Sequence, residues 1–293
     1  MKNLTLLLYL FLLALPISIM GQNLKNKEKS SYVVFDLKYE SDAVFMGRND
    51  SVSAPYLVPS LGFYDKSGFF ADASLSYLTK SEESRIDLCL LTAGYQFNSK
   101  KLSGLLSGTK YFFSKDSYSI QSEIEGDLTA TLGYDLSLFK ISLTASSYFS
   151  SNSSTDFFAG IQLDKSIYAL DDNLEITPTF NIYGGSQYFY QEYYTYNRLG
   201  NRKGKNNAEN PSINNSIAIK EVNLFNVLNL EISLPIQFQS NSFLFSFTPH
   251  WAFPQSNATI TTNETILKEN LKNIFYWSAG ISYWLNTKKR NKQ

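Results

Sequence analysis

The chain has 293 residues, and its 26 basic and 26 acidic side chains give a net charge of +0. This balance argues against a general nucleic-acid binder, which usually carries a basic excess. Cys89 is the only cysteine, so an intramolecular disulfide is excluded and a cysteine-based metal site is not expected. The 20 tyrosines and 22 phenylalanines favour a protein built of β-strands, in which aromatic side chains are enriched.

The first residues have the pattern of a secretory signal peptide, residues 1–21. Lys2 precedes an apolar run, Leu4–Met20, which is followed by Gly21 and a polar segment. We expect cleavage near Gly21 and a flexible lead-in over residues 22–30. The alternative is an uncleaved transmembrane helix. That run is short for a span of about 20 residues, and Pro16 interrupts it.

Alternation of apolar and polar residues with a period of two predicts about twelve strands. The longest alternation, Ser117–Tyr134, places apolar or small side chains at even positions and polar ones, three of them carboxylates, at odd positions. It exceeds an ordinary strand of about 5–6 residues, and its period excludes a helix. In chain order, the predicted strands cover residues 33–40, 57–63, 69–77, 85–97, 102–113, 117–134, 139–149, 157–164, 174–182, 222–238, 243–253 and 275–283.

Some segments break the alternation. A change of apolar parity between Leu90 and Leu91 predicts a β-bulge in the fourth strand. The longest irregular region is Gly184–Ser216, and the later connection is expected to hold a short helix at Ile266–Leu271. A basic tail covers residues 286–293.

Connections between the predicted strands mostly alternate between short turns and longer loops, which is typical of outer-membrane barrels. Aromatic residues of the apolar face lie near both ends of the strands, as in the two interfacial belts of such barrels. The alternative is a soluble β-sandwich, which does not explain such long strands or paired belts. We therefore predict an all-β, transmembrane antiparallel up-and-down β-barrel of about 12 strands over residues 31–285.

Three segments carry a resemblance to a known group of proteins: Ser41–Arg48, Pro55–Ser60 and Lys66–Gly68. With the strand pattern, they resemble a Gram-negative outer-membrane β-barrel of the Bacteroidota type. The resemblance implies a multi-pass barrel in the cell outer membrane. A barrel in this location is expected to have outer-membrane lipids, lipopolysaccharide and the barrel-assembly machinery as partners, whereas the neutral charge balance predicts no nucleic acid. The resemblance carries over no catalytic residue and no cofactor.

Charged residues on the polar faces of the predicted strands form the candidate lumen cluster. Lumen carboxylates could attract cations or hold Ca²⁺, which prefers oxygen ligands. The alternative is an ion-paired lumen, in which Lys140 and Lys110 neutralise the carboxylates. The mixed signs of the charges favour this alternative, and no metal site is predicted. The predicted cluster comprises Glu123, Glu125, Asp127, Lys140, Asp36, Lys38 and Glu175.

The irregular region Gly184–Ser216 is rich in tyrosine and then in basic residues, which suits a contact surface. The alternative is that its tyrosines extend the strands above the membrane. The predicted contact residues of this extracellular loop are Tyr190, Tyr193, Tyr194, Tyr196, Arg198 and Arg202.

Function is expected to be a passive pore for small solutes, or a structural barrel with surface-binding loops. The alternative is a membrane-embedded lipid hydrolase that uses His250, the only histidine. Ser246 and Thr248 share the strand face of His250, but the chain has no Gly-x-Ser-x-Gly motif. The sequence therefore predicts no enzyme.

Overall fold

The computed structural model describes residues 30–50, 53–80, 83–114, 117–121, 123–150, 154–193, 218–220, 222–261 and 266–286. The predicted signal peptide, most of the predicted lead-in and nearly all of the basic tail lie outside these residues. Among the described residues, no helix is both long and apolar enough to span a membrane.

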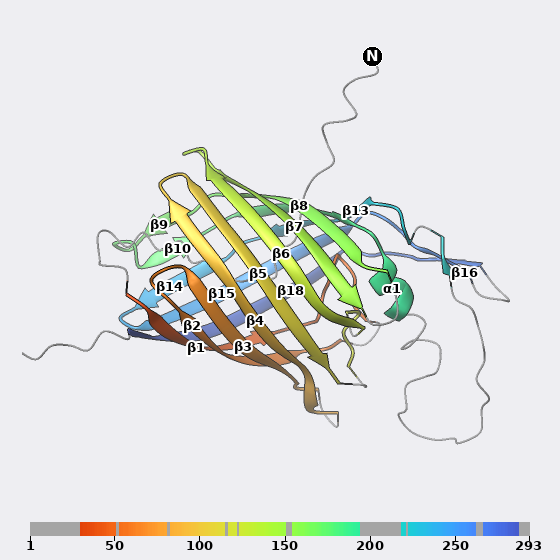
Figure 1. Cartoon of the computed structure of the whole chain (residues 1–293), viewed down its shortest axis with the longest axis horizontal. Coiled ribbons are helices and arrows are strands. Elements are labelled where there is room, and N and C mark those ends of the chain that lie inside the picture. Colours follow the sequence, from red (N-terminus) through yellow and green to blue (C-terminus); the bar gives the residue numbers. More distant parts are fainter. Residues whose placement is uncertain are drawn as a thin grey trace, which may run out of the picture.

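The described strands form a closed antiparallel barrel of 12 strands, as predicted (Figure 1). Neighbours along the chain are neighbours in the barrel, and β1 pairs with β18 from Tyr32↔Asn286 to Glu40↔Ser278. Each described strand of the barrel wall is paired with a neighbour on both sides, as a barrel in lipid requires. The strands are β1 (Tyr32–Glu40), β2 (Tyr56–Tyr64), β3 (Phe69–Leu78), β4 (Arg85–Ser99), β5 (Leu102–Phe113), β6 (Ile124–Asp135), β7 (Lys140–Ser150), β8 (Asp156–Asp164), β11 (Thr179–Gly185), β13 (Asn226–Ser233), β15 (Phe243–Pro254) and β18 (Ile274–Asn286).

Two barrel strands are interrupted at prolines. β10 (Leu174–Ile176) leads into β11 past Pro178, and β13 leads into β14 (Ile236–Ser240) past Pro235. Proline has no N–H to donate to the hydrogen-bond ladder, so the strand pairing is interrupted there. Beyond the prolines, β10 pairs with β14, and β14 pairs with β15. A short strand, β9 (Ile167–Ala169), pairs with β10 at the short-turn end.

The two faces of the wall differ as the alternation predicts. Large apolar side chains point outward and are exposed around the whole barrel, for example Phe35, Leu61, Leu106, Leu128 and Phe245. Their chain neighbours, which point inward, are mostly Ser, Thr, Asp and other polar residues. Water-soluble monomers rarely expose an apolar surface of this extent, whereas lipid chains require one. The chain is a multi-pass β-barrel of the outer membrane.

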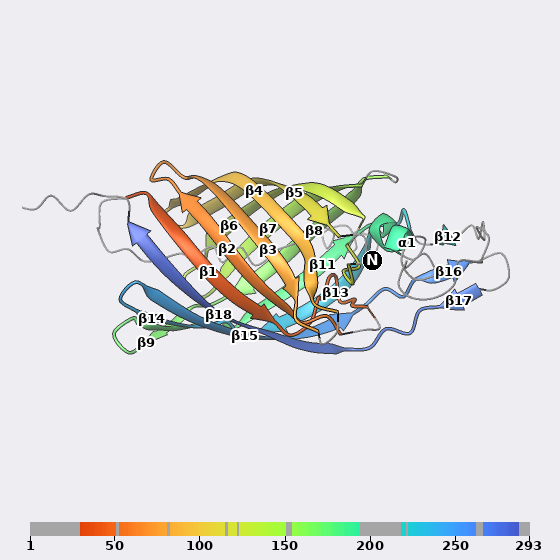
Figure 2. The same ribbon diagram turned by 90° about the horizontal axis from the view of Figure 1, so that it is seen from below.

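The long-loop end of the barrel carries additional structure. The helix α1 (Tyr188–Tyr193) lies at this end, and β12 (Ala218–Ile219), β16 (Thr259–Thr261) and β17 (Ile266–Lys268) form a small sheet beyond it (Figure 2). The predicted helix Ile266–Leu271 is therefore wrong. Its first residues are extended because they pair with Thr259–Thr261.

The sixth strand starts later than predicted. β6 begins at Ile124, and residues 117–121 precede it as a turn that buries Ile120. The pairing with β7 also shifts between Ile124 and Gly126, so that Glu125 is a bulged residue. The predicted bulge of β4 lies nearer its start, at Asp87, because Ser76 pairs with Leu88 and Tyr77 with Ile86.

Candidate functional site

Side chains from the loops fill the barrel at its long-loop end. The β1–β2 loop, the turn before β6, α1, and the segments around β12 and β16 all contribute. With inward-facing wall residues they form one apolar cluster, here called the mouth cluster, whose members are at most 7% exposed. It comprises Phe45, Met46, Tyr111, Ile120, Ile124, Tyr148, Phe158, Tyr183, Phe189, Tyr190, Tyr193, Ile219, Leu228, Ala258 and Ile260.

The tip of the β1–β2 loop crosses the lumen. Phe45 lies at this tip, and its ring centroid is 6.0 Å from that of Tyr148, 5.7 Å from Phe158 and 5.1 Å from Phe189. Tyr148 is on β7 and Phe158 is on β8, the strands opposite β1 and β2 in the closed order. Aromatic contacts at these distances are stabilising beyond the area they bury. The loop tip is therefore fixed against the far wall.

Gly47 allows this close approach. Its φ of +73° is in the region that favours glycine, and an added Cβ would lie 2.7 Å from Oδ1 of Asn229 and 3.0 Å from Cβ of Pro254. Both neighbours belong to the wall, on β13 and β15. A side chain at this position would therefore strain the turn and press on two strands at once.

We expect Gly47→Ala to loosen the loop tip, because left-handed strain and overpacking each cost about 1–3 kcal/mol. Trypsin cleavage after the buried Arg48 measures this, and the variant should be cut faster than the parent in detergent. Gly108→Ala is the matched control. Its Cβ would meet a side-chain methyl of Leu128 at 3.2 Å on the outer wall. Equal cleavage of both variants would contradict the close packing at Gly47.

Arg48 holds the loop tip to three other segments. Its Nη2 donates to Oε1 of Gln187 at 2.9 Å and to the carbonyl oxygen of Ser256 at 2.6 Å. Nη2 and Nε also reach the two carboxylate oxygens of Glu269, at 3.1 and 3.2 Å. The guanidinium lies 4.6 Å from the ring centroid of Tyr190. The side chains of Arg48 and Glu269 are only 1% and 8% exposed, so this is a buried, doubly bonded ion pair.

Asp156 fixes the start of α1 to the wall. Its Oδ1 accepts from Oγ of Ser186 at 2.6 Å and from N of Tyr188 at 2.9 Å, and its Oδ2 accepts from N of Phe189 at 2.6 Å. These backbone N–H groups would otherwise be unpaired at a helix start, where a carboxylate is favourable. A wall residue of β8 therefore positions the helix whose rings complete the mouth cluster.

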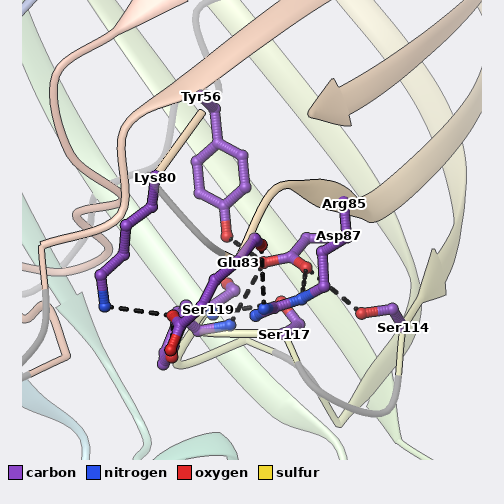
Figure 3. Close-up of polar contacts among 9 residues, drawn as sticks. Tyr56, Lys80, Glu83, Arg85, Asp87, Ser114, Ser117 and Ser119 are labelled. Carbon is purple, nitrogen blue, oxygen red and sulfur yellow. Dashed lines mark hydrogen bonds and ion pairs between the residues drawn. The ribbon is translucent and has the colours of Figure 1, made fainter. Parts of the chain in front are cut away.

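A polar cluster separate from the mouth cluster, here called the rim cluster, joins the loops after β3 and β5 (Figure 3). Asp87 accepts from Tyr56 Oη at 2.5 Å and from Arg85 Nε at 2.6 Å. Glu83 accepts from Tyr118 Oη at 2.6 Å and from Lys80 at 3.1 Å. These two hydrogen bonds lower the pKa of the Glu83 carboxyl. Each of these acidic side chains is paired with a basic one. The hydrogen bond from Tyr118 to Glu83 joins the two loops.

The wall below the mouth cluster carries several of the predicted lumen charges. Lys38 pairs with Glu40 at 2.6 Å, and Asp36 accepts a hydrogen bond from Ser282. Asp127 accepts from Tyr111 at 3.1 Å and from Thr129 at 2.7 Å. The charges of this inner wall are of mixed sign and are held by neighbouring side chains.

Two further predicted lumen residues lie near the short-turn end. Lys140 stands opposite Asp164 on β8 and Asp135 on β6 in the strand register. Glu175 accepts a hydrogen bond from Tyr168 at 3.2 Å. Predicted lumen residues are therefore spread along the barrel and do not form one cluster.

Glu125 does not face the lumen. As the bulged residue of β6 it points to the outer surface, where its carboxylate pairs with Lys110 at 3.0 Å and both side chains are about half exposed. Lys110 shares the outward parity of Leu106 and Phe112 on β5. Glu123 lies in the turn before the strand. The prediction that three carboxylates share one face of the strand was wrong. The alternation in the sequence continues through a turn and a bulge, where it no longer reports which way a side chain points.

The predicted contact tyrosines are part of the interior. Tyr190 and Tyr193 are buried in the mouth cluster, where Tyr190 donates to Glu269 and Tyr193 donates to Asp50. They are in a helix that packs inward, so they do not form the predicted contact surface. Tyr194, Tyr196, Arg198 and Arg202 lie outside the described residues.

His250 faces the lumen. Its Nδ1 lies 3.0 Å from Oε1 of Glu231, and its ring stacks on Tyr276 with centroids 4.5 Å apart. Tyr276 donates to the other oxygen of Glu231 at 3.0 Å. Ser246, on the same strand face, is four residues away, and Ser233 stands opposite His250 in the register. The histidine is therefore on the wall face that lipid chains do not reach.

Comparison with protein families and with curated proteins finds no match. Among solved structures, the chain is similar to KdgM porin, with 6% identity, coverage of 86% of this chain and 98% of that chain, and a TM-score of 0.46. The chain is also similar to NanC porin, with 8% identity, coverage of 86% of this chain and 98% of that chain, and a TM-score of 0.46. For LpxR from Salmonella typhimurium, the identity is 10%, the coverage is 87% of this chain and 99% of that chain, and the TM-score is 0.41. These identities and TM-scores are low, so function is inferred from this chain's own residues.

Proposed function

We propose that this protein is a structural outer-membrane barrel whose own loops close its outer mouth and present a folded surface to the exterior. The supporting observation is the β1–β2 loop tip, which crosses the lumen to β7 and β8 and is held there by Arg48 and the mouth cluster. Close-packed aromatic side chains leave little space for solutes. In this proposal, the polar side chains of the inner wall mainly form ion pairs and hydrogen bonds with one another.

A passive pore for small solutes is the second candidate. The polar inner wall favours it, because Ser107, Thr129 and Ser282 give the lumen a hydrophilic surface along the strands. In this case the loop tip would have to leave the lumen for solutes to pass.

Conductance in planar bilayers distinguishes the two candidates. The parent protein is expected to give no stable conductance steps. A variant with residues 45–48 replaced by two glycines should give stable steps, since the chain segment across the lumen is removed. Stable conductance steps in the parent itself, equal to those of the variant, would favour the passive pore. Folding of the variant is checked first by its resistance to denaturation in unheated gels.

We also propose that the protein is not an enzyme. A lipid hydrolase of the bilayer would need its nucleophile and base on the lipid side, and His250 is on the inner wall beside Glu231 and Tyr276. The mutual pairing of these groups supports a structural role. Phospholipid release should be unchanged in His250→Ala.

The location in the outer membrane supports a proposal about partners. We propose outer-membrane lipids and lipopolysaccharide around the apolar outer wall, and the barrel-assembly machinery during insertion. The Bacteroidota-type origin remains a proposal that rests on the sequence resemblance.

A further inference from the structure

A crevice of about 500 Å³ lies on the outside of the barrel at its long-loop end. Its walls come from the segment before β8, the start of α1 and the turn before β13, which meet at this end (Figure 1). The volume is within the range of about 300–1,000 Å³ that is typical of sites for small ligands. The crevice is separate from the mouth cluster, which faces inward.

Aromatic rings form the apolar part of the crevice. Phe157 and Phe225 line it with 57% and 42% of their surface exposed, and Tyr188 contributes a third ring. Phe225 packs against Gly184, where an added Cβ would lie 3.0 Å from its ring. This backbone contact supports one side of the ring.

Hydrogen bonds between the segments hold the crevice in shape. The N–H of Ser186 donates to the carbonyl oxygen of Phe157 at 3.1 Å, and the N–H of Phe157 donates to Oγ of Ser186 at 3.1 Å. The N–H of Gln187 donates to the carbonyl oxygen of Val222 at 2.9 Å. All three segments are thus linked through the backbone, so a ligand would meet walls that are already ordered.

The polar groups of the crevice are uncharged. Ser154, Thr155 and Asn223 supply hydroxyl and amide groups, and none of the described lining residues is acidic or basic. A hexose ring has one face of C–H groups and an edge of hydroxyls. The C–H face suits the electron-rich face of an aromatic ring, and the hydroxyls suit Ser, Thr and Asn, which donate and accept hydrogen bonds.

The position of the crevice indicates the source of such a sugar. Phe157 is at the start of β8, beside the outward-facing Phe149 at the end of β7, where the apolar outer wall ends. This level corresponds to the headgroups of the outer leaflet. We propose that the crevice binds uncharged sugar residues of an outer-leaflet glycolipid, through Phe157, Phe225 and Tyr188.

Calorimetry on the full chain, refolded in a zwitterionic detergent without a sugar headgroup, tests the proposal. The probes are intact lipopolysaccharide, its core oligosaccharide freed of lipid, and dihexanoyl phosphatidylethanolamine. We expect the first two to bind and the phospholipid not to bind. Phe157→Ala and Phe225→Ala should each weaken binding of the oligosaccharide by about tenfold.

Phe275→Ala is the matched control, because Phe275 has the same 57% exposure near the long-loop end of β18 and is not part of the crevice. It should leave binding unchanged. Equal weakening by all three substitutions, or binding that requires acyl chains, would overturn the proposal. Binding of the free oligosaccharide without binding of intact lipopolysaccharide would overturn the glycolipid source. These outcomes do not depend on whether the lumen conducts.

Discussion

Arg48→Ala is expected to open the outer mouth of the barrel. The substitution leaves Glu269 buried without its partner and removes the bonds to Gln187 and Ser256. Breaking a buried ion pair in this way costs about 3–5 kcal/mol. The wall is held by its own strand pairing, so the loss falls on the loops. Conductance and the uptake of small sugars by proteoliposomes should rise from near zero to a clear signal.

Lys110→Ala provides the control for this experiment. Lys110 also pairs with a glutamate, but that pair is half exposed on the outer wall, where an ion pair contributes about 0–1 kcal/mol. Its conductance should equal that of the parent. The double variant Arg48→Ala with Glu269→Gln should recover part of the lost stability, because no unpaired buried charge is left. A closed Arg48→Ala barrel would show that the ion pair does not hold the loops.

Leu106→Arg is expected to prevent stable insertion into the membrane. Leu106 is at the middle of β5, and 60% of its surface is exposed on the outer wall. An arginine at the bilayer midplane of a barrel costs about 2–4 kcal/mol. Urea unfolding of the protein in phospholipid vesicles measures this as a loss of unfolding free energy. The amount of folded protein in cells should decrease as well.

Ser60→Arg is the matched change on the opposite face. Ser60 points into the lumen and is paired in the register with Asp36, whose carboxylate would attract the new cation. We expect little change in unfolding free energy. If Ser60→Arg were the more damaging of the two, the assignment of the inner and outer faces would be reversed.

The barrel was predictable because its physics is local and periodic. A wall residue has lipid on one side and the lumen on the other, so alternation along the chain reports the fold directly, as in Leu128, Thr129 and Ala130. The twelve strands and their order follow from this pattern, and the structure confirms them. Even the strand broken at Pro178 keeps its parity across the break.

The candidate site was less predictable because it depends on packing between distant loops. Tyr190 and Tyr193 have the composition of a contact surface, yet they are buried against segments more than 60 residues away. Glu125 continued the alternation but is a bulged residue. One signal was present in the sequence: Phe45 and Met46 are apolar residues that precede Arg48 in the connection between the first two predicted strands.

The pairing of the first strand with the last sets the order of events during biogenesis. Each of the nine contacts between β1 and β18 joins residues 238 to 254 positions apart, and contacts between residues so distant in sequence form slowly. The cylinder cannot close before the segment that forms β18 is present, because β1 and β15 both pair with it. Loss of residues 274–286 would leave two strands with unpaired backbone in lipid and no route to a finished wall.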